Sequence, residues 1–178
     1  MIKKLSTDHL SDAFSIIESV IAKMNDEQIF QWDEHYPTHK IIEKDIDDGH
    51  AFGYFHLKEL KGYIVLNEEY SPEYNSLEWK DKSKTSLIVH RLSIKADCQG
   101  QGIAKQLMIF AEDYAKKNNY FSVKLDAFLH NKAALHLYEK SGYTKVGTVR
   151  FRKGEFNCYE KVSVPDHRQH TIHLLYLN

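Results

Sequence analysis

Cysteine, proline and long hydrophobic runs are scarce in this sequence of 178 residues. Only Cys98 and Cys158 are present, which argues against a disulfide framework and a cysteine-based zinc site. The three prolines form no Pro/Gly/Ser linker that would divide the chain. No apolar run approaches the ~18 residues needed to cross a bilayer, and the residues after Leu5 are too polar for a signal peptide. We therefore expect a single domain in a reducing, cytoplasmic setting.

Excess charge of either sign is also missing. The formal net charge is −1 and the sequence pI is about 6.8, so the global field attracts neither nucleic acid nor anionic substrates. The hydrophobic fraction of 42% and the charged fraction of 28% are those of a globular protein. We expect no nucleic-acid or membrane partner.

The apolar periodicity predicts a mixed α/β chain. Helical spacing is found at residues 8–23, 37–48, 103–118 and 131–140. In the first of these, Phe14, Ile17, Val20 and Ile21 form the expected core stripe. Strand-like runs occur at residues 2–5, 51–57, 62–67, 86–94, 121–127, 143–149 and 156–162, with a turn at 58–61 and a polar loop at 70–85. The strand–helix–strand succession after residue 86 predicts one parallel pair in an otherwise antiparallel sheet.

A glycine loop stands between the strand at 86–94 and the helix that follows. It reads Gln99, Gly100, Gln101, Gly102, Ile103 and Ala104. The first turn of a helix leaves backbone N–H groups without partners at the positive end of the helix dipole, so a phosphate or diphosphate fits there. Glycines let the backbone approach that anion. The alternative is a tight turn that uses glycine for its geometry alone.

Two common nucleotide motifs do not fit this loop. The chain contains no Gly, four residues, then Gly-Lys-Ser/Thr, which excludes a P-loop. A dinucleotide fingerprint that starts at Gly100 needs Gly or Ala where Lys105 stands.

The loop instead resembles that of the GNAT superfamily of acyl-CoA-dependent N-acetyltransferases, which has Gln or Arg, two residues, Gly, one residue, then Gly or Ala. Gln99, Gly102 and Ala104 occupy those positions. A second motif of that superfamily follows on the next helix, in the order Asn131, Ala134, Leu137, Tyr138, Gly142 and Tyr143. The resemblance covers about Ser86 to Lys161.

This resemblance implies a fold and a co-substrate. The fold is a central, mostly antiparallel sheet of about seven strands flanked by helices, with a splayed parallel pair at the cofactor site. Acetyl-CoA is the implied co-substrate, and no metal is implied. Its pantetheine arm would contact the backbone of Leu92, Ser93 and Ile94, its diphosphate would bind the amides from Gln99 to Ala104, and Asn131 would contact an amide of the arm. As an alternative, Asn131 is an ordinary helix N-cap.

Tyr138 is the catalytic residue that the resemblance implies. It stands seven residues after Asn131, so the two share a helix face about two turns apart. Its implied role is a hydrogen bond to the departing CoA sulfur. Taken alone, a helical tyrosine is more often a core residue.

The implied reaction is direct attack of a neutral amine on the thioester in a ternary complex. Deprotonating a lysine-like amine at pH 7 costs roughly 4.6 kcal/mol, so a base is needed. The strand before the loop carries the apolar Leu87, Ile88 and Val89, and His90 is the nearest titratable residue. A hydrogen-bonded structural histidine is the alternative.

Acceptor specificity is expected from the half at residues 1–85, and cofactor binding from the half at 86–161. Trp32, Glu34 and Tyr36 would form an aromatic and acidic wall for a small-molecule or peptide amine. The alternative is a connection that packs Trp32 into the core.

Other features of the sequence give weaker indications of function. His167, His170 and His173 lie in a C-terminal extension (162–178) whose alternating pattern suggests extended structure, so we predict no metal there. Its apolar run suits an edge strand or a homodimer contact. Cys98 has no identified base beside it and is interpreted as a spectator thiol. A non-catalytic acyl-CoA sensor remains the alternative function; it would not need Tyr138.

Overall fold

The computed structural model describes residues 1–82 and 85–163 and contains a seven-stranded sheet with the order β1-β2-β3-β4-β5-β7-β6. The strands are β1 (Ile2–Lys4), β2 (Ala51–His56), β3 (Glu59–Asn67), β4 (Ser86–Ile94), β5 (Ser122–Phe128), β6 (Thr144–Phe151) and β7 (Gly154–Val162). Neighbours are antiparallel except β4 and β5, which are parallel. The predicted mixed sheet with one parallel pair is confirmed.

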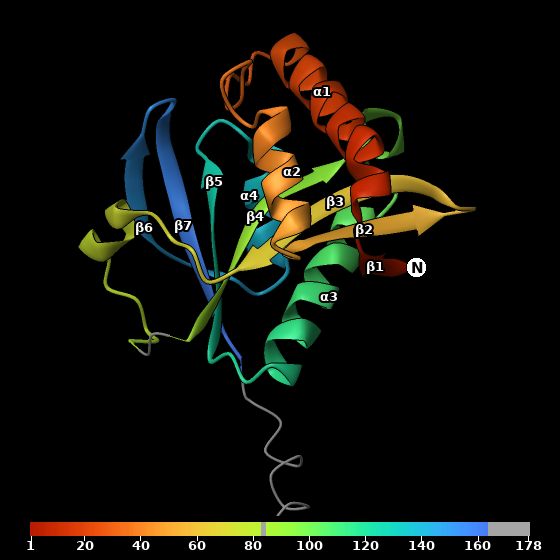
Figure 1. The fold of residues 1–178 in the computed structure, drawn as a ribbon. Helices are drawn as coiled ribbons and strands as arrows, with labels where there is room; N and C mark the ends of the chain where they lie inside the picture. The colour runs from red at the N-terminus through yellow and green to blue at the C-terminus, as the bar shows by residue number, and fades with distance from the viewer. Residues whose placement is uncertain (83–84, 164–178) are drawn as a thin grey trace, which may run out of the picture.

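Helices cover both faces of the sheet (Figure 1). Successive residues of a strand point to opposite faces, so Tyr63 and Val65 of β3 join the core under α1 (Leu10–Asp26) and α2 (His39–Asp47). Ile64 and Leu66 join the opposite core, with α3 (Ile103–Lys117) and α4 (Lys132–Lys140). This alternation explains why β3 is apolar without interruption from Tyr63 to Leu66.

Helix α1 buries the stripe that its periodicity predicts, with one shift. On α1 the buried residues are Ala13, Ile16, Ile17, Val20 and Met24, whereas Phe14 and Ile21 are only partly buried. The stripe therefore faces the core through the small Ala13 rather than Phe14.

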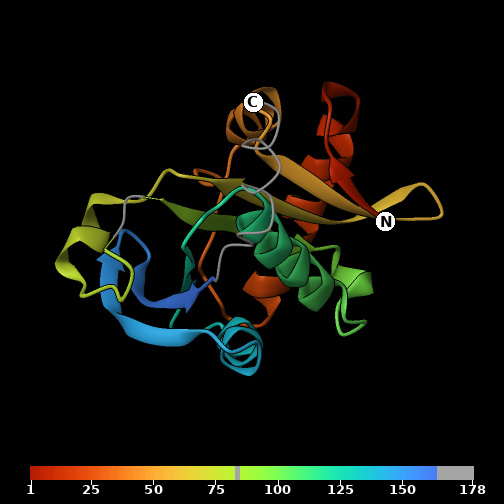
Figure 2. The same cartoon turned by 90° about the horizontal axis from the view of Figure 1, so that it is seen from below.

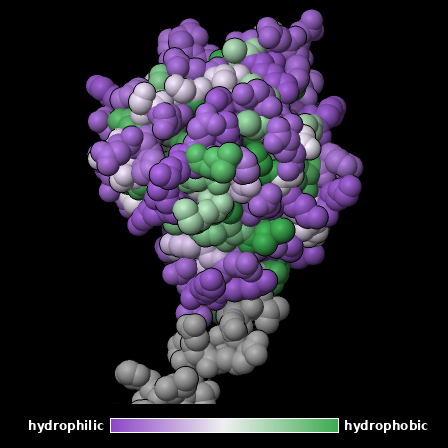
Figure 3. All heavy atoms as spheres, turned by 90° about the vertical axis from the view of Figure 1, so that its right-hand side faces the viewer, coloured by the Kyte–Doolittle hydropathy of each residue, from purple (hydrophilic) through white to green (hydrophobic). Residues whose placement is uncertain are grey.

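Figure 3 shows the side of the molecule with the β2–β3 hairpin. This side is mostly hydrophilic, with a hydrophobic patch in its middle.

The turn between β2 and β3 is shorter than predicted. Strand β3 begins at Glu59, so the turn consists of Leu57 and Lys58 and not of residues 58–61. Both residues have positive φ, 47° and 70°, as a two-residue hairpin turn requires. The sequence concealed it because neither residue is Gly or Asn.

The two ends of the sheet differ (Figure 2). The hairpin of β6 and β7 lies at one end beside the short 3₁₀ turn Pro72–Ser76, and β1 lies at the other end. The buried Glu160 of β7 accepts hydrogen bonds from the backbone N–H groups of Lys80 and Asp81, at 2.8 and 3.1 Å. The loop that precedes β4 is therefore attached to the far half of the sheet.

The parallel pair opens along its length. Three pairs join β4 to β5, the last being Ile88 with Lys124. Beyond them β4 continues to Ile94 along β3, and β5 continues to Phe128 along β7. The strands thus diverge and leave a gap in the middle of the sheet.

None of the helices in residues 1–82 and 85–163 is both long and apolar enough to cross a membrane. His167, His170, His173 and the apolar run after them lie outside the described residues.

Candidate active site

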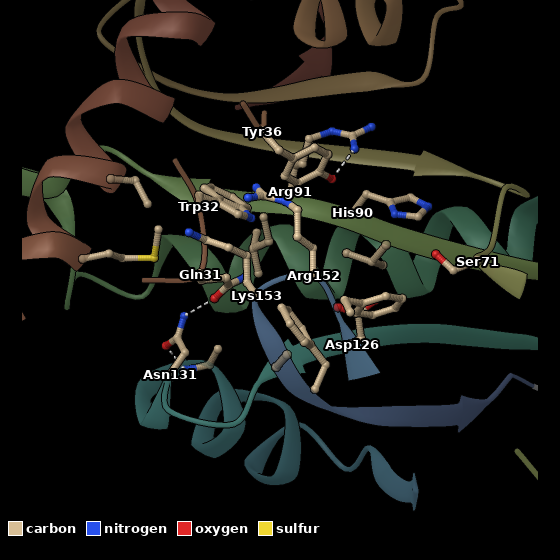
Figure 4. A pocket seen from close by; sticks show the side chains of 18 of the residues that line it. Gln31, Trp32, Tyr36, Ser71, His90, Arg91, Asp126, Asn131, Arg152 and Lys153 are labelled. Atoms are coloured by element: carbon tan, nitrogen blue, oxygen red, sulfur yellow. Dashed lines mark hydrogen bonds between the residues drawn. The ribbon is translucent and has the colours of Figure 1, made fainter. Parts of the chain in front are cut away.

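A cavity of about 430 Å³ occupies the gap between β4 and β5 (Figure 4). Four parts of the fold line it: the end of α1 with the segment that follows, strand β4, strand β5 with the start of α4, and the β6–β7 hairpin. Its polar lining residues include Gln31, Tyr36, Ser71, Tyr74, His90, Arg91, Asp126, Asn131, Tyr138, Arg152 and Lys153. The cavity is therefore the place where the two halves of the chain meet.

The glycine loop lies beyond the end of β4 and has the geometry of an anion site. Gly100 and Gly102 have φ of 78° and 79°, and a Cβ at either position would meet no atom within 4 Å. Gly102 is the N-cap of α3, and no side chain in the described part of the protein caps it. Gln99 donates from Nε2 to the carbonyl of Ile94 at 3.2 Å, which holds the loop against β4. An open, uncapped helix start of this kind suits a phosphate.

Asn131 caps α4. Its Oδ1 accepts from the N–H of Ala134 at 3.1 Å, so the N-cap interpretation is confirmed. Its Nδ2 donates to Oε1 of Gln31 at 3.2 Å, across the cavity that both residues line (Figure 4). Its contact with a cofactor stays a prediction.

Tyr138 lies near the end of α4, where it is buried and also lines the cavity. Its ring packs against those of Tyr143 and Tyr159 at centroid distances of 6.2 and 5.9 Å. Within residues 1–82 and 85–163, no group hydrogen-bonds to its hydroxyl. Burial, and then the nearby Asp126 carboxylate, raise its pKa, so this phenol is a hydrogen-bond donor at neutral pH.

His90 lies on the cavity wall but is occupied. Its Nε2 is 2.8 Å from the carbonyl oxygen of Glu69 and 3.0 Å from Oδ1 of Asn67. Because a carbonyl only accepts, Nε2 carries the proton. Burial, and then the positive charge of Arg91, lower the pKa of His90 to about 4. Such an imidazole stays neutral and is a weak base.

Asp126 is a cavity residue that the sequence reasoning missed. It lies on the divergent part of β5 and accepts a hydrogen bond of 2.6 Å from the hydroxyl of Tyr74. Burial raises the pKa of this carboxyl, which the Tyr74 bond opposes. The signal in the sequence was a single acidic residue inside the apolar run from Leu125 to Phe128.

The predicted acceptor wall is partly assembled. Trp32 is buried, and it lines the cavity together with Tyr36, with ring centroids 6.5 Å apart. Packing of Trp32 in the core, the alternative interpretation, thus coexists with its place in the cavity wall. The side chain of Glu34 is 79% exposed and lines a shallower neighbouring hollow instead.

Two cations of the β6–β7 turn also reach the cavity, which the sequence did not indicate. Arg152 and Lys153 both pair with Asp33, each at 2.9 Å. They hold the pKa of the Asp33 carboxyl well below its usual range. These pairs tie the segment between α1 and α2 to the hairpin across the cavity mouth.

The remaining predicted residues are backbone or spectator positions. Leu92 lines the cavity, whereas Ser93 and Ile94 are buried in β4, so these two can present only backbone groups. Cys98 is buried, and burial followed by its bond to Asp97 raises the pKa of its thiol. In the described residues no group of three or more His, Cys, Asp or Glu is arranged to hold a metal.

Comparison with known proteins yields one family. The acetyltransferase (GNAT) family model matches residues 17–143. Streptothricin acetyltransferase of Escherichia coli is 29% identical over 117 residues, which are 65% of this chain and 60% of that protein. The chain spans about half the length of the curated relatives that it matches.

Solved structures share the fold. A GNAT acetyltransferase of Streptococcus agalactiae superposes with a TM-score of 0.77 at 22% identity, over 92% of this chain and 95% of that one. The PaiA N-acetyltransferase of Thermoplasma acidophilum, solved with coenzyme A, has a TM-score of 0.67 at 20% identity, over 91% and 98% of the two chains.

Proposed function

The chain belongs to the GNAT acetyltransferase family, and from this premise we propose that it moves the acetyl group of acetyl-CoA to a primary amine by direct attack in a ternary complex. The observation that carries the proposal is the arrangement along one gap in the sheet. An open, uncapped glycine turn stands beyond the end of β4, and the cavity between β4 and β5 contains a carboxylate and a tyrosine hydroxyl.

The chain offers each part of acetyl-CoA a complementary surface. The amides from Gln99 to Ala104 would bind the diphosphate, since Gly100 and Gly102 leave open space beside them. The backbone of β4 at Leu92, Ser93 and Ile94 is free of β5 on that side and would pair with the pantetheine arm. Asn131 would exchange its bond to Gln31 for an amide of the arm.

Asp126 is the base in this proposal, in place of His90. The attacking amine must lose a proton, and a carboxyl whose pKa is raised by burial accepts it more readily than an exposed aspartate. His90 has a low pKa, and its Nε2 proton is already committed to Glu69. As the C–N bond forms and the C–S bond breaks, the amine proton passes to Asp126.

Tyr138 stabilises the leaving thiolate in this proposal. Its hydroxyl lines the cavity without a hydrogen-bond partner among the described residues, and it lies on the α4 face shared with Asn131. Full proton transfer from a phenol to a thiolate is uphill by roughly 2 kcal/mol even with ordinary pKa values. A hydrogen bond to the sulfur is therefore the role that we assign.

The acceptor is a small-molecule or peptide amine in this proposal. Trp32 and Tyr36 present aromatic surface in the same cavity as Asp126, which suits an aliphatic amine with or without further charge. Glu34 is positioned to contact only the outer part of such an acceptor. Streptothricin belongs in any panel of test amines, because a relative is a streptothricin acetyltransferase.

The test is release of free thiol from acetyl-CoA against a panel of amino acids, peptides, diamines and antibiotic amines, with acetyl-CoA binding measured by calorimetry. We expect binding and at least one acceptor that accelerates thiol release. Binding without transfer to any amine would favour the acyl-CoA sensor, and absence of binding would contradict both functions.

A further inference from the structure

Strand β4 has a β-bulge where it has just left β5. In the β3–β4 ladder, Val65 pairs with His90 and Tyr63 pairs with Ser93. One residue of β3, Ile64, therefore faces two of β4, Arg91 and Leu92. A bulge bends its strand and leaves backbone groups outside the ladder. This one forms the cavity wall.

Arg91 has a conformation that a long side chain rarely adopts. Its φ is 51°, in the left-handed region. Such a residue persists where its surroundings over-determine it, and it is common at ligand sites.

The Arg91 side chain supplies those surroundings. Its Nε and Nη2 donate to the two carboxylate oxygens of Asp45 on α2, at 2.8 and 2.5 Å. Its Nη1 donates to the hydroxyl of Tyr36 at 2.7 Å (Figure 4). Tyr63 donates to the same carboxylate at 2.9 Å. The side chains of Arg91 and Asp45 are only 11% and 8% exposed.

This cluster connects three parts of the molecule. Arg91 belongs to the cavity wall on β4, Asp45 to α2 beneath the sheet, and Tyr36 to the segment that forms the acceptor wall. A bidentate pair fixes both position and orientation, unlike a single hydrogen bond. The bulged backbone and the acceptor wall are thus held by one guanidinium.

We propose that Arg91 is a positioning residue for acyl transfer, an inference that rests on the proposed function. Through Asp45 and Tyr36 it sets the position of the bulged β4 backbone against the pantetheine and thioester end of acetyl-CoA. It acts only on that end, because the anion-binding loop is attached to β4 separately, through Gln99.

A purely structural ion pair makes a different prediction. Removing one partner of a buried pair destabilises a protein strongly, whereas replacing both partners often leaves stability nearly unchanged. The informative variant is therefore the double substitution Arg91→Met with Asp45→Asn, because the new amide oxygen can still accept the Tyr63 bond. Tyr63→Phe is the control, since it removes a bond to the same carboxylate but keeps the guanidinium of Arg91 and its pair with Asp45.

The experiment compares two ligands by calorimetry: acetyl-CoA, and 3′-phosphoadenosine 5′-diphosphate, which has the nucleotide and diphosphate but no pantetheine arm. For the double variant we expect about tenfold weaker binding of acetyl-CoA, the equivalent of one or two hydrogen bonds. Binding of the nucleotide should stay within about twofold of wild type, as should both ligands with Tyr63→Phe.

Equal acetyl-CoA affinity in the double variant and the wild type overturns the proposal, and so does an equal loss for both ligands. If the double variant does not fold, Arg91→Lys carries the same comparison, since lysine keeps the charge but loses the bidentate geometry. A wild-type protein that fails to bind acetyl-CoA contradicts the proposed function instead.

Discussion

Asp126 on β5 and His90 on β4 are two titratable residues that line the same cavity and differ in their suitability as a base. Burial disfavours the charged form of each side chain, so it shifts the two pKa values in opposite directions. For the Asp126 carboxyl this raises the pKa and so strengthens the conjugate base. For His90 it lowers the pKa to about 4 and weakens the base.

Asp126→Asn should therefore reduce kcat/KM by about 10²–10⁴-fold, the usual contribution of a general base. His90→Gln should cost far less, and it is the matched control. The measurement is steady-state kinetics with an acceptor from the amine panel. A larger loss in the His90 variant would return the role of base to the imidazole.

The same carboxyl determines a pH dependence. Since the pKa of Asp126 in the folded protein is raised, wild-type kcat/KM should rise with pH through that raised pKa, and Asp126→Asn should abolish this rise.

The raised pKa also links the stability of the fold to pH. The stability contributed by the protonated Asp126 carboxyl is present below the unfolded pKa and is lost as pH rises through the folded pKa. The Asn variant should therefore melt at a higher temperature than wild type at pH 7–8. A lower melting temperature would identify Asp126 as a structural residue.

Tyr138→Phe tests the leaving-group contact. Because the Tyr138 hydroxyl has no hydrogen-bond partner in the described residues, its loss should leave stability and acetyl-CoA affinity nearly unchanged. Turnover should fall by roughly 10–100-fold, the cost of one hydrogen bond to a developing charge. Calorimetry and kcat measured on the same preparation separate the two effects, and equal turnover would remove the proposed role.

At the scale of elements, α3 and α4 begin in different ways. Helix α4 is capped by its own Asn131, whereas α3 starts at Gly102 without a side-chain cap in the described structure. Uncapped amides are costly unless water or a ligand satisfies them. The start of α3 is thus better suited to an external anion than the start of α4.

Gly102→Ala should weaken acetyl-CoA binding at least tenfold, because its Cβ enters the space proposed for the diphosphate. It also imposes about 1–2 kcal/mol of backbone strain at positive φ. Gly142→Ala is the control, since Gly142 has φ of 84° and lies at the opposite end of α4 from Asn131, where an added Cβ would meet only the end of the Lys161 side chain, at an ordinary contact distance of 3.9 Å. The two variants should lose similar melting temperature, and only Gly102→Ala should lose affinity. Equal affinities would exclude this loop as the diphosphate site.

At the scale of the whole molecule, the sheet consists of two parts joined by a short parallel ladder. Three residue pairs connect β4 with β5 in the described chain. Further contacts cross the cavity mouth, from Asp33 to Arg152 and Lys153 and from Gln31 to Asn131. A ligand that fills the gap would add a further connection between the two parts.

Hydrogen–deuterium exchange should detect that connection. With saturating acetyl-CoA we expect slower exchange in residues 89–94, 99–106 and 131–135, because their amides line the gap or the anion site. Strands β1 and β2, far from the gap, should not change. Protection confined to β1 and β2 would place the ligand elsewhere.

The sequence alone determined the main helices and strands and the position of the glycine turn before α3. Side-chain periodicity is a local property, so β4 and α4 could be predicted to within a residue or two. The glycine loop was recognisable because positive φ and close backbone approach restrict the residue type locally.

Only the tertiary structure decided the chemistry of the cavity. Whether His90 or Asp126 is the better base depends on how each is buried. It also depends on contacts between residues far apart in sequence, from Glu69 to His90 and from Tyr74 to Asp126. Similarly, Arg91 meets Asp45 and Tyr36 only because the fold brings α2 and the segment before it to the same face of β4. Proton affinities and bulge geometry are set by what surrounds a residue in space, and local sequence does not contain that information.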